Sequence, residues 1–187
     1  MLDILSELRQ KSAPASMLSS KLRQYEMSLN TIQEEITSLM TKLFTSALPT
    51  DAADDVRRQL RIAHEYESVS DCIDNLERLE EKMRQTEDWQ PSKFHQGITG
   101  LSEKTKSVLV GINTALRTND HEYLKEFASA KEHVQTQVKQ IRSKQLEQLS
   151  NAGVSPAITS VILAILNGYT HLFCHFENIV EDLAEEE

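Results

Sequence analysis

The sequence predicts an all-α protein, an antiparallel bundle of helices without a sheet. Its 187 residues include only 5 Gly and 4 Pro, and 26% of them are charged. This composition is typical of helix-rich chains and lacks the turn signals of sheets. Apolar residues recur at intervals of three and four along most of the chain, which is the helical period, and no segment alternates as a strand does. A chain of this length buries about 70% of its unfolded surface, so a substantial core is expected.

Two helices are expected before Pro49. A short amphipathic helix over residues 2–11 stops ahead of Pro14, because a residue that precedes proline avoids the helical conformation. It is either complete or the end of a longer helix, in which case the chain is cut from a larger protein. A long bundle helix over residues 15–48 follows. Its apolar stripe consists of Leu18, Leu22, Tyr25, Leu29, Ile32, Ile36, Leu39 and Leu43.

The third helix, over residues 54–83, is the most informative segment. Thr50 or Asp51 is expected to cap it, and an apolar stripe marks its core side. Beside the stripe runs a row of potential ligands at i, i+3, i+7 and i+10: His64, Glu67, Asp71 and Asp74. Like charges at such spacings destabilise a helix by about 0.2–0.5 kcal/mol per pair, and a cation or a basic partner would reverse this effect. The row is either a solvated acidic face or a site for such a ligand.

Residues 59–76 of this helix resemble the signature helix of the PhoU family. That motif is a carboxylate, three residues and an aspartate, which Glu67 and Asp71 match, and Glu65 falls on a third position that is often acidic. The resemblance implies an all-helical domain of two similar three-helix halves, which binds metal clusters through this motif in some members and regulates phosphate uptake. PhoU-like domains also form the cytoplasmic C-terminal part of many bacterial sodium/phosphate cotransporters.

The resemblance extends the set of candidate metal ligands. In PhoU-type repeats the preceding helix also carries acidic residues four apart, and here Glu26 and the amide Asn30 stand at those positions. Glu26 is therefore a candidate ligand together with Glu65, Glu67, Asp71, His64 and Asp74. The cofactor that this set implies is a divalent ion of Fe, Zn, Ni, Mn or Mg.

The second half is expected to begin after a polar break over residues 86–91, which contains the only tryptophan, Trp89. The predicted division is residues 1–88 and 89–187. Helices are expected over residues 93–117 and 122–149, with Gly153 ending the latter. Ser155 and Pro156 start the last helix as N-cap and first helical residue. Its stripe is the cleanest in the chain and predicts the central element of this half: Ile158, Ile162, Ile165, Tyr169, Leu172, Phe176, Ile179 and Leu183.

The last helix reads as an internal repeat of the third. Residues 169–181 overlay 66–78, with Thr170 and Cys174 standing where Glu67 and Asp71 stand. A second metal cluster of the family type is therefore not expected. His171 and His175, spaced i and i+4, form either an exposed pair or a site for zinc or nickel.

Several function classes are disfavoured. A formal charge of −9 opposes contact with nucleic acid or an anionic membrane. Cys72 and Cys174 lack CxxC spacing and are expected as packing residues in a reducing cytoplasm. No window approaches the roughly 18 apolar residues of a membrane span, so the chain is expected to be soluble. His64 and Glu65 begin like a zincin motif, but Ser68 stands where the second histidine is required, and no other catalytic set is found.

Two hypotheses follow. The first is a non-catalytic PhoU-like domain in the cytoplasm, tied to the inner membrane through an upstream sodium/phosphate cotransporter domain or free-standing as a regulator of phosphate uptake. Its partner would be the transporter membrane domain or a transport-regulatory protein, and a homodimer is a further candidate assembly. The second is a structural helical adaptor without ligand chemistry.

Overall fold

The computed structural model describes residues 1–10, 15–45, 49–85, 91–119, 121–151 and 155–184. These parts contain six α-helices and one short 3-10 helix, with no strand among them, which confirms the predicted all-α bundle. The elements are α1 (Leu2–Gln10), α2 (Ala15–Phe44), α3 (Thr50–Arg84), α4 (Pro91–Thr118), η1 (His121–Leu124), α5 (Phe127–Ser150) and α6 (Pro156–Ala184).

Some predicted boundaries hold and others do not. Ser155 caps α6 as expected, since its Oγ accepts a hydrogen bond from the Ile158 amide at 3.3 Å. The predicted caps Thr50 and Asp51 are wrong, because α3 starts at Thr50 directly after Pro49, which makes no side-chain capping bond. The helix predicted over residues 122–149 starts late, at Phe127. The predicted break at Trp89 and the predicted stop at Gly153 lie outside the described residues.

The late start of α5 follows from the turn after α4. Asn119 has a φ of 51°, a left-handed conformation that asparagine tolerates better than most residues. The chain then forms the single turn of η1, and α5 begins after it. A sequence pattern alone does not distinguish a 3-10 turn from the first turn of the helix behind it.

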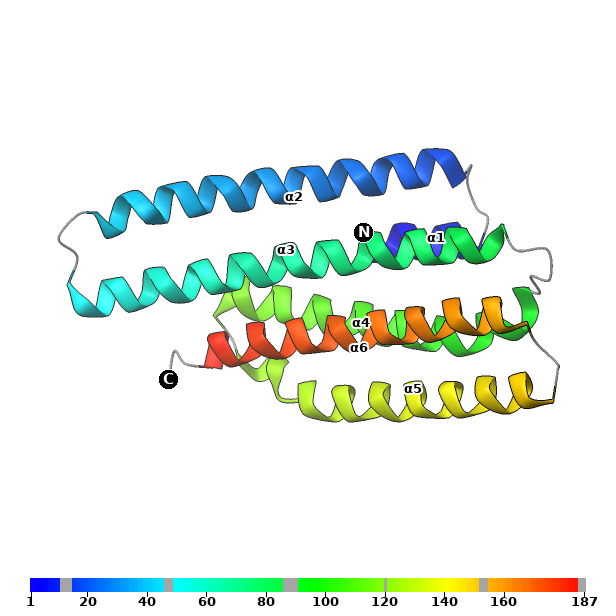
Figure 1. Ribbon diagram of the computed structural model, residues 1–187. Helices are drawn as coiled ribbons and strands as arrows, with labels where there is room; N and C mark the ends of the chain where they lie inside the picture. Colours follow the sequence, from blue (N-terminus) through cyan, green and yellow to red (C-terminus); the bar gives the residue numbers. More distant parts are fainter. Residues whose placement is uncertain (11–14, 46–48, 86–90, 120, 152–154, 185–187) are drawn as a thin grey trace.

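The centre of the bundle is the antiparallel pair of α3 and α6, with α2 outside α3 and α5 outside α6 (Figure 1). Every predicted stripe position of α6 is buried, as expected. The two helices come so close at Gly168 that a Cβ there would stand 2.7 Å from Cδ2 of Leu76. A glycine in mid-helix therefore serves close packing of the central pair.

α6 also corrects an expectation about membranes. It is long and apolar enough to cross a bilayer by length and composition, with a mean hydropathy of 1.5 in its best window. Half of that window is buried inside the bundle. The core helix of a bundle can meet the same criterion when it is apolar on most faces. A search limited to continuous apolar runs does not detect such a helix.

α1 lies at one end of a trough between α2 and α4. It packs on both helices, and its Asp3 carboxylate pairs with Lys106 of α4. Its apolar side is fully used, because four of its residues are buried: Leu2, Ile4, Leu5 and Leu8. Beyond α1 the trough stays open, which is the feature that most distinguishes the first three helices from the last three.

Candidate functional site

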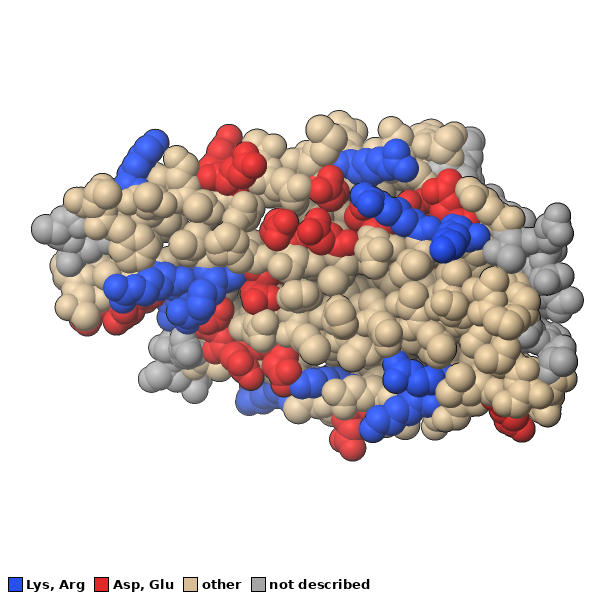
Figure 2. All heavy atoms as spheres, in the orientation of Figure 1, with Lys and Arg blue, Asp and Glu red and all other residues tan. Residues whose placement is uncertain are grey.

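The acidic segment of α3 faces several different neighbours, with acidic side chains gathered over the middle of α3 in Figure 2. Glu65 turns towards α6, where its Oε2 lies 2.7 Å from Nδ1 of His175 and its Oε1 accepts a hydrogen bond from Asn178 at 2.9 Å. Sequence reasoning had assigned Glu65 and His175 to two separate candidate sites. The structure joins them in one polar contact between the central helices.

A second polar contact lies one turn away on the same pair of helices. Arg61 donates through Nε (2.7 Å) and Nη2 (2.6 Å) to Oδ1 of Asp182, whose side chain is 11% exposed. Together with the Glu65 contact, it fixes the register of α3 against α6. Charge-assisted bonds to a largely buried carboxylate are stronger than exposed ion pairs, so this end of the central pair is firmly tied.

The remaining members of the predicted row do not share one surface. His64 Nδ1 lies 2.8 Å from Nε2 of Gln33 on α2, and Asp71 is exposed. Asp74 is buried and lies 2.5 Å from Nη2 of Arg78, one turn along its own helix. The expectation of a common acidic face that includes Asp74 is therefore wrong, because α3 has neighbours on several sides along its length.

The candidate metal ligands are not brought together. Glu26 accepts a hydrogen bond from Asn30 at 2.6 Å on α2, and His171 is exposed while His175 is engaged with Glu65. In the parts of the chain that the structure describes, no three His, Cys, Asp or Glu side chains form a group that could hold a metal ion. As placed, these residues do not fit the cluster that the resemblance implies.

Sequence reasoning missed a buried acidic pair at the other end of α3. Glu77 and Glu80 are 1% and 2% exposed. Glu77 accepts a hydrogen bond from Ser19 of α2 at 2.6 Å, and Arg84 reaches both carboxylates, at 3.7 Å and 4.0 Å. Their spacing from Ile73 places them on the apolar stripe, so the helical period could have identified both as buried.

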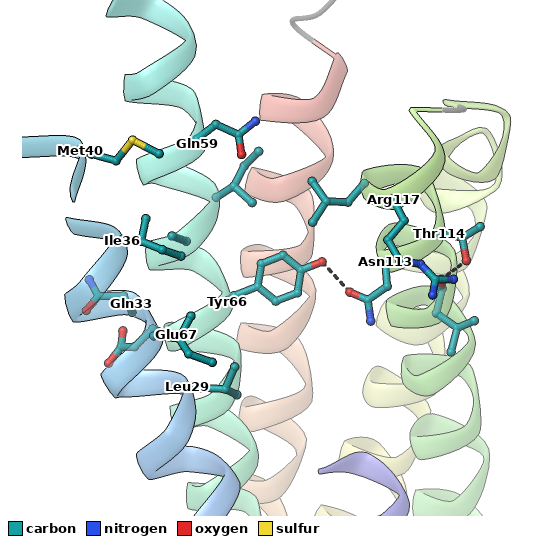
Figure 3. A pocket seen from close by; sticks show the side chains of 15 residues that line it. Leu29, Gln33, Ile36, Met40, Gln59, Tyr66, Glu67, Asn113, Thr114 and Arg117 are labelled. Atoms are coloured by element: carbon teal, nitrogen blue, oxygen red, sulfur yellow. Dashed lines mark hydrogen bonds between the residues drawn. The ribbon is translucent and has the colours of Figure 1, made fainter. Parts of the chain in front are cut away.

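An open apolar groove of about 660 Å³ lies between α2, α3 and α4. Tyr66 reaches from α3 across its floor and donates a hydrogen bond to Oδ1 of Asn113 on α4 at 2.6 Å (Figure 3). Burial raises the pKa of Tyr66 to about 12. The apolar lining residues include Leu29, Ile32, Ile36, Met40, Ile62, Ala63, Val110 and Leu116.

The groove overturns one expectation about α2. Its whole stripe was expected to face the core, yet only Leu18 and Leu22 are buried. Ile32 and Leu39 are 50% and 55% exposed, and Val110 across the groove is 55% exposed. The period of the sequence indicated an apolar face correctly, but it did not show that this face is covered at one end only.

No family model, curated protein or solved structure matches the chain.

Proposed function

We propose that the chain is a non-catalytic regulatory module of the PhoU-like kind, which acts on phosphate transport through protein contacts. Its proposed partner is the membrane domain of a sodium/phosphate cotransporter, on the cytoplasmic side of the inner membrane. The resemblance of residues 59–76 to the family's signature helix supports the proposal, as does the all-α bundle.

The observation that carries the proposal is the pairing of α3 with α6. The helix with the signature-like segment and the helix that repeats it pack antiparallel at the centre, tied by Glu65 to His175 and by Arg61 to Asp182. Each is covered by one outer helix, α2 or α5. This is the arrangement expected of two related three-helix halves that share one core.

Protein contact is favoured over ion chemistry by where the acidic side chains lie. Glu65 is occupied by two donors from α6, and Asp74 by Arg78. Among the described residues, neither carboxylate forms a metal-binding group with Glu67 or Asp71, as a shared ligand set would require.

Sodium-dependent phosphate uptake in the source cells tests the proposal. Removing the coding region for residues 1–187 should change the rate of uptake or its response to external phosphate, and the parent chain should restore it. The double variant Glu67→Gln, Asp71→Asn should also restore it, because no metal is required. Unchanged uptake after removal would sink the role in phosphate transport, and failure of a folded double variant would sink the metal-independent form.

The second candidate is a structural helical adaptor without ligand chemistry. The absence of a metal-binding group among the described residues, together with the uncovered apolar face of α2, favours it. The two candidates differ in the same assay, since an adaptor unrelated to transport leaves phosphate uptake unaltered when it is removed.

A further inference from the structure

The stripe of α2 follows the stricter period of a coiled coil. From Leu18 to Leu43 its eight apolar positions are spaced alternately by four and three residues, so that two of them recur in every seven residues. A sustained 3.5-residue repeat keeps one seam facing a partner helix along its whole length. In the described structure α3 covers one side of the α2 stripe, which is called the seam below, while the other side is open. On the open side Tyr25, Ile32 and Leu39 are 45%, 50% and 55% exposed.

The second half of the molecule shows what covers such a seam. There α4, with 28 residues, packs against both α5 and α6. In the first half the corresponding place is held by α1, which has 9 residues and packs on the N-terminal end of α2. The groove begins beyond the N-terminal end of α1, since Leu29 and Ile32 line both the groove and the smaller hollow beside Met1 and Ile4. The part of α2 that α1 does not reach therefore lacks the neighbour that α4 provides for α5.

We propose that this groove is filled by α2 of a second copy of the chain, lying antiparallel to the first α2 in a two-fold symmetric dimer. A two-fold axis perpendicular to α2 makes the two α2 helices antiparallel, which is the direction that α1 already has against α2 (Figure 1). Each α2 then supplies the ridge that fills the partner's groove and one wall of its own groove. Such an isologous contact is self-complementary.

The geometry leaves room for this exchange. The adjacent ends of α2 and α3 project beyond the ends of α4 and α6 in Figure 1, so the exposed part of α2 is accessible from outside the bundle. Figure 3 shows Ile36 and Met40 of α2 on one side of the groove and Asn113 and Arg117 of α4 on the other. A convex helix fits between them, whereas a flat or concave protein surface would leave the floor uncovered.

Charges at the groove agree with a helix like α2. Glu67 and Arg117 line it, and neither has an ion-pair or hydrogen-bond partner among the described residues. α2 carries both signs beside its stripe, with Glu35 and Lys42 next to Ile36 and Leu43. A second α2 can therefore place an opposite charge near each of the two groove charges. The groove and the stripe support the dimer independently of the proposed role in phosphate transport.

Sedimentation equilibrium over a dilution series tests the proposal. The parent should form a dimer, and Ile32→Asp should be monomeric with an unchanged helical circular dichroism spectrum, because half of this side chain is exposed in the single copy. Leu39→Asp is a second seam variant with the same expectation. The matched control is Leu146→Asp, which changes a 45% exposed leucine on α5, outside the groove, and should remain dimeric.

A monomeric parent at every concentration overturns the proposal, and the groove then serves a helix of another protein. A dimer that survives both seam substitutions overturns it as well. Direction is tested by Leu39→Cys in a background with Cys72→Ser and Cys174→Ser. An antiparallel pair keeps the two introduced thiols apart, so an intermolecular disulfide on mild oxidation would contradict the arrangement.

Discussion

The two outer helices, α2 and α5, show how equivalent positions in a bundle come to differ. α5 has buried residues from Phe127 to Gln145, along most of its length. α2 has the more regular apolar stripe but is fully buried only at Leu18 and Leu22. The difference lies in the neighbours, because α4 runs beside α5 whereas α1 runs beside only one end of α2. An apolar pattern indicates which face of a helix can be buried, and the length of the neighbouring helices determines how much of that face is buried.

The two central helices differ in a complementary way. α6 is buried almost entirely through apolar side chains, whereas α3 also buries polar ones: Ser70, Asp74, Glu77 and Glu80. Buried carboxylates are costly unless they are paired, and Arg78 and Arg84 provide the pairing. The core of the second half is therefore predominantly hydrophobic, and that of the first half is partly electrostatic.

The largest effect is expected in the apolar centre of the second half. Phe176 is fully buried on α6 and stacks edge-on against Phe173 with 5.5 Å between ring centroids. Phe176→Ala should lower the free energy of unfolding by about 3–5 kcal/mol, measured by urea denaturation. His171→Ala, at an exposed position of the same helix, should change it by less than about 0.5 kcal/mol. Similar losses in both variants would show that α6 is not the centre of the fold.

The next prediction separates the two ends of α2. Leu22→Ala should cost about 2–5 kcal/mol, because that side chain is 0% exposed. Leu39→Ala should cost no more than about 0.5 kcal/mol in the monomer, because 55% of the side chain already faces solvent. The two substitutions are chemically identical and occupy the same stripe, so equal costs would mean that the groove is covered within a single copy.

A third prediction concerns the contact between the halves. Gly168→Ala should destabilise the fold by up to about 2 kcal/mol, since its Cβ would stand 2.7 Å from Leu76 Cδ2 and overpacking outweighs the better helix propensity. Gly100→Ala is the matched control. Its Cβ would meet only Gln137 at 3.6 Å, so it should stabilise α4 by up to about 1 kcal/mol. Thermal melts that show the same sign for both would contradict the close approach of α3 and α6.

How far the sequence predicted this structure can be read from particular residues. The stripe of α6 and the cap at Ser155 were predicted correctly, because helical period and capping chemistry are local. The contact of Glu65 with His175 was not, because those residues are 110 positions apart and nothing local encodes their meeting. The prediction of one acidic face was wrong at Asp74 for a related reason. Residues in a regular row on one helix differ in burial when different neighbouring helices pack against different parts of the row.

The smallest predicted effect is on pH dependence in the groove. Burial raises the pKa of Tyr66 from 10.0 to about 12, so between those values the unfolded chain loses a proton that the folded chain keeps. Its stabilising contribution is complete below pH 10 and is lost as the pH rises towards 12. Melting temperature should therefore fall more steeply over this range in the parent than in Tyr66→Phe. Tyr25→Phe, at a 45% exposed position, is the control, and identical slopes in parent and Tyr66→Phe would refute the assignment.

Hydrogen exchange followed by mass spectrometry tests the contrast between the halves most directly. At dilutions where the protein is monomeric, amides of residues 29–44 on α2 should exchange at least about tenfold faster than those of residues 130–145 on α5, because local opening is easier where fewer apolar contacts are buried. Equal or slower exchange over residues 29–44 in the monomer would contradict the account that the first half is left open where the second is closed.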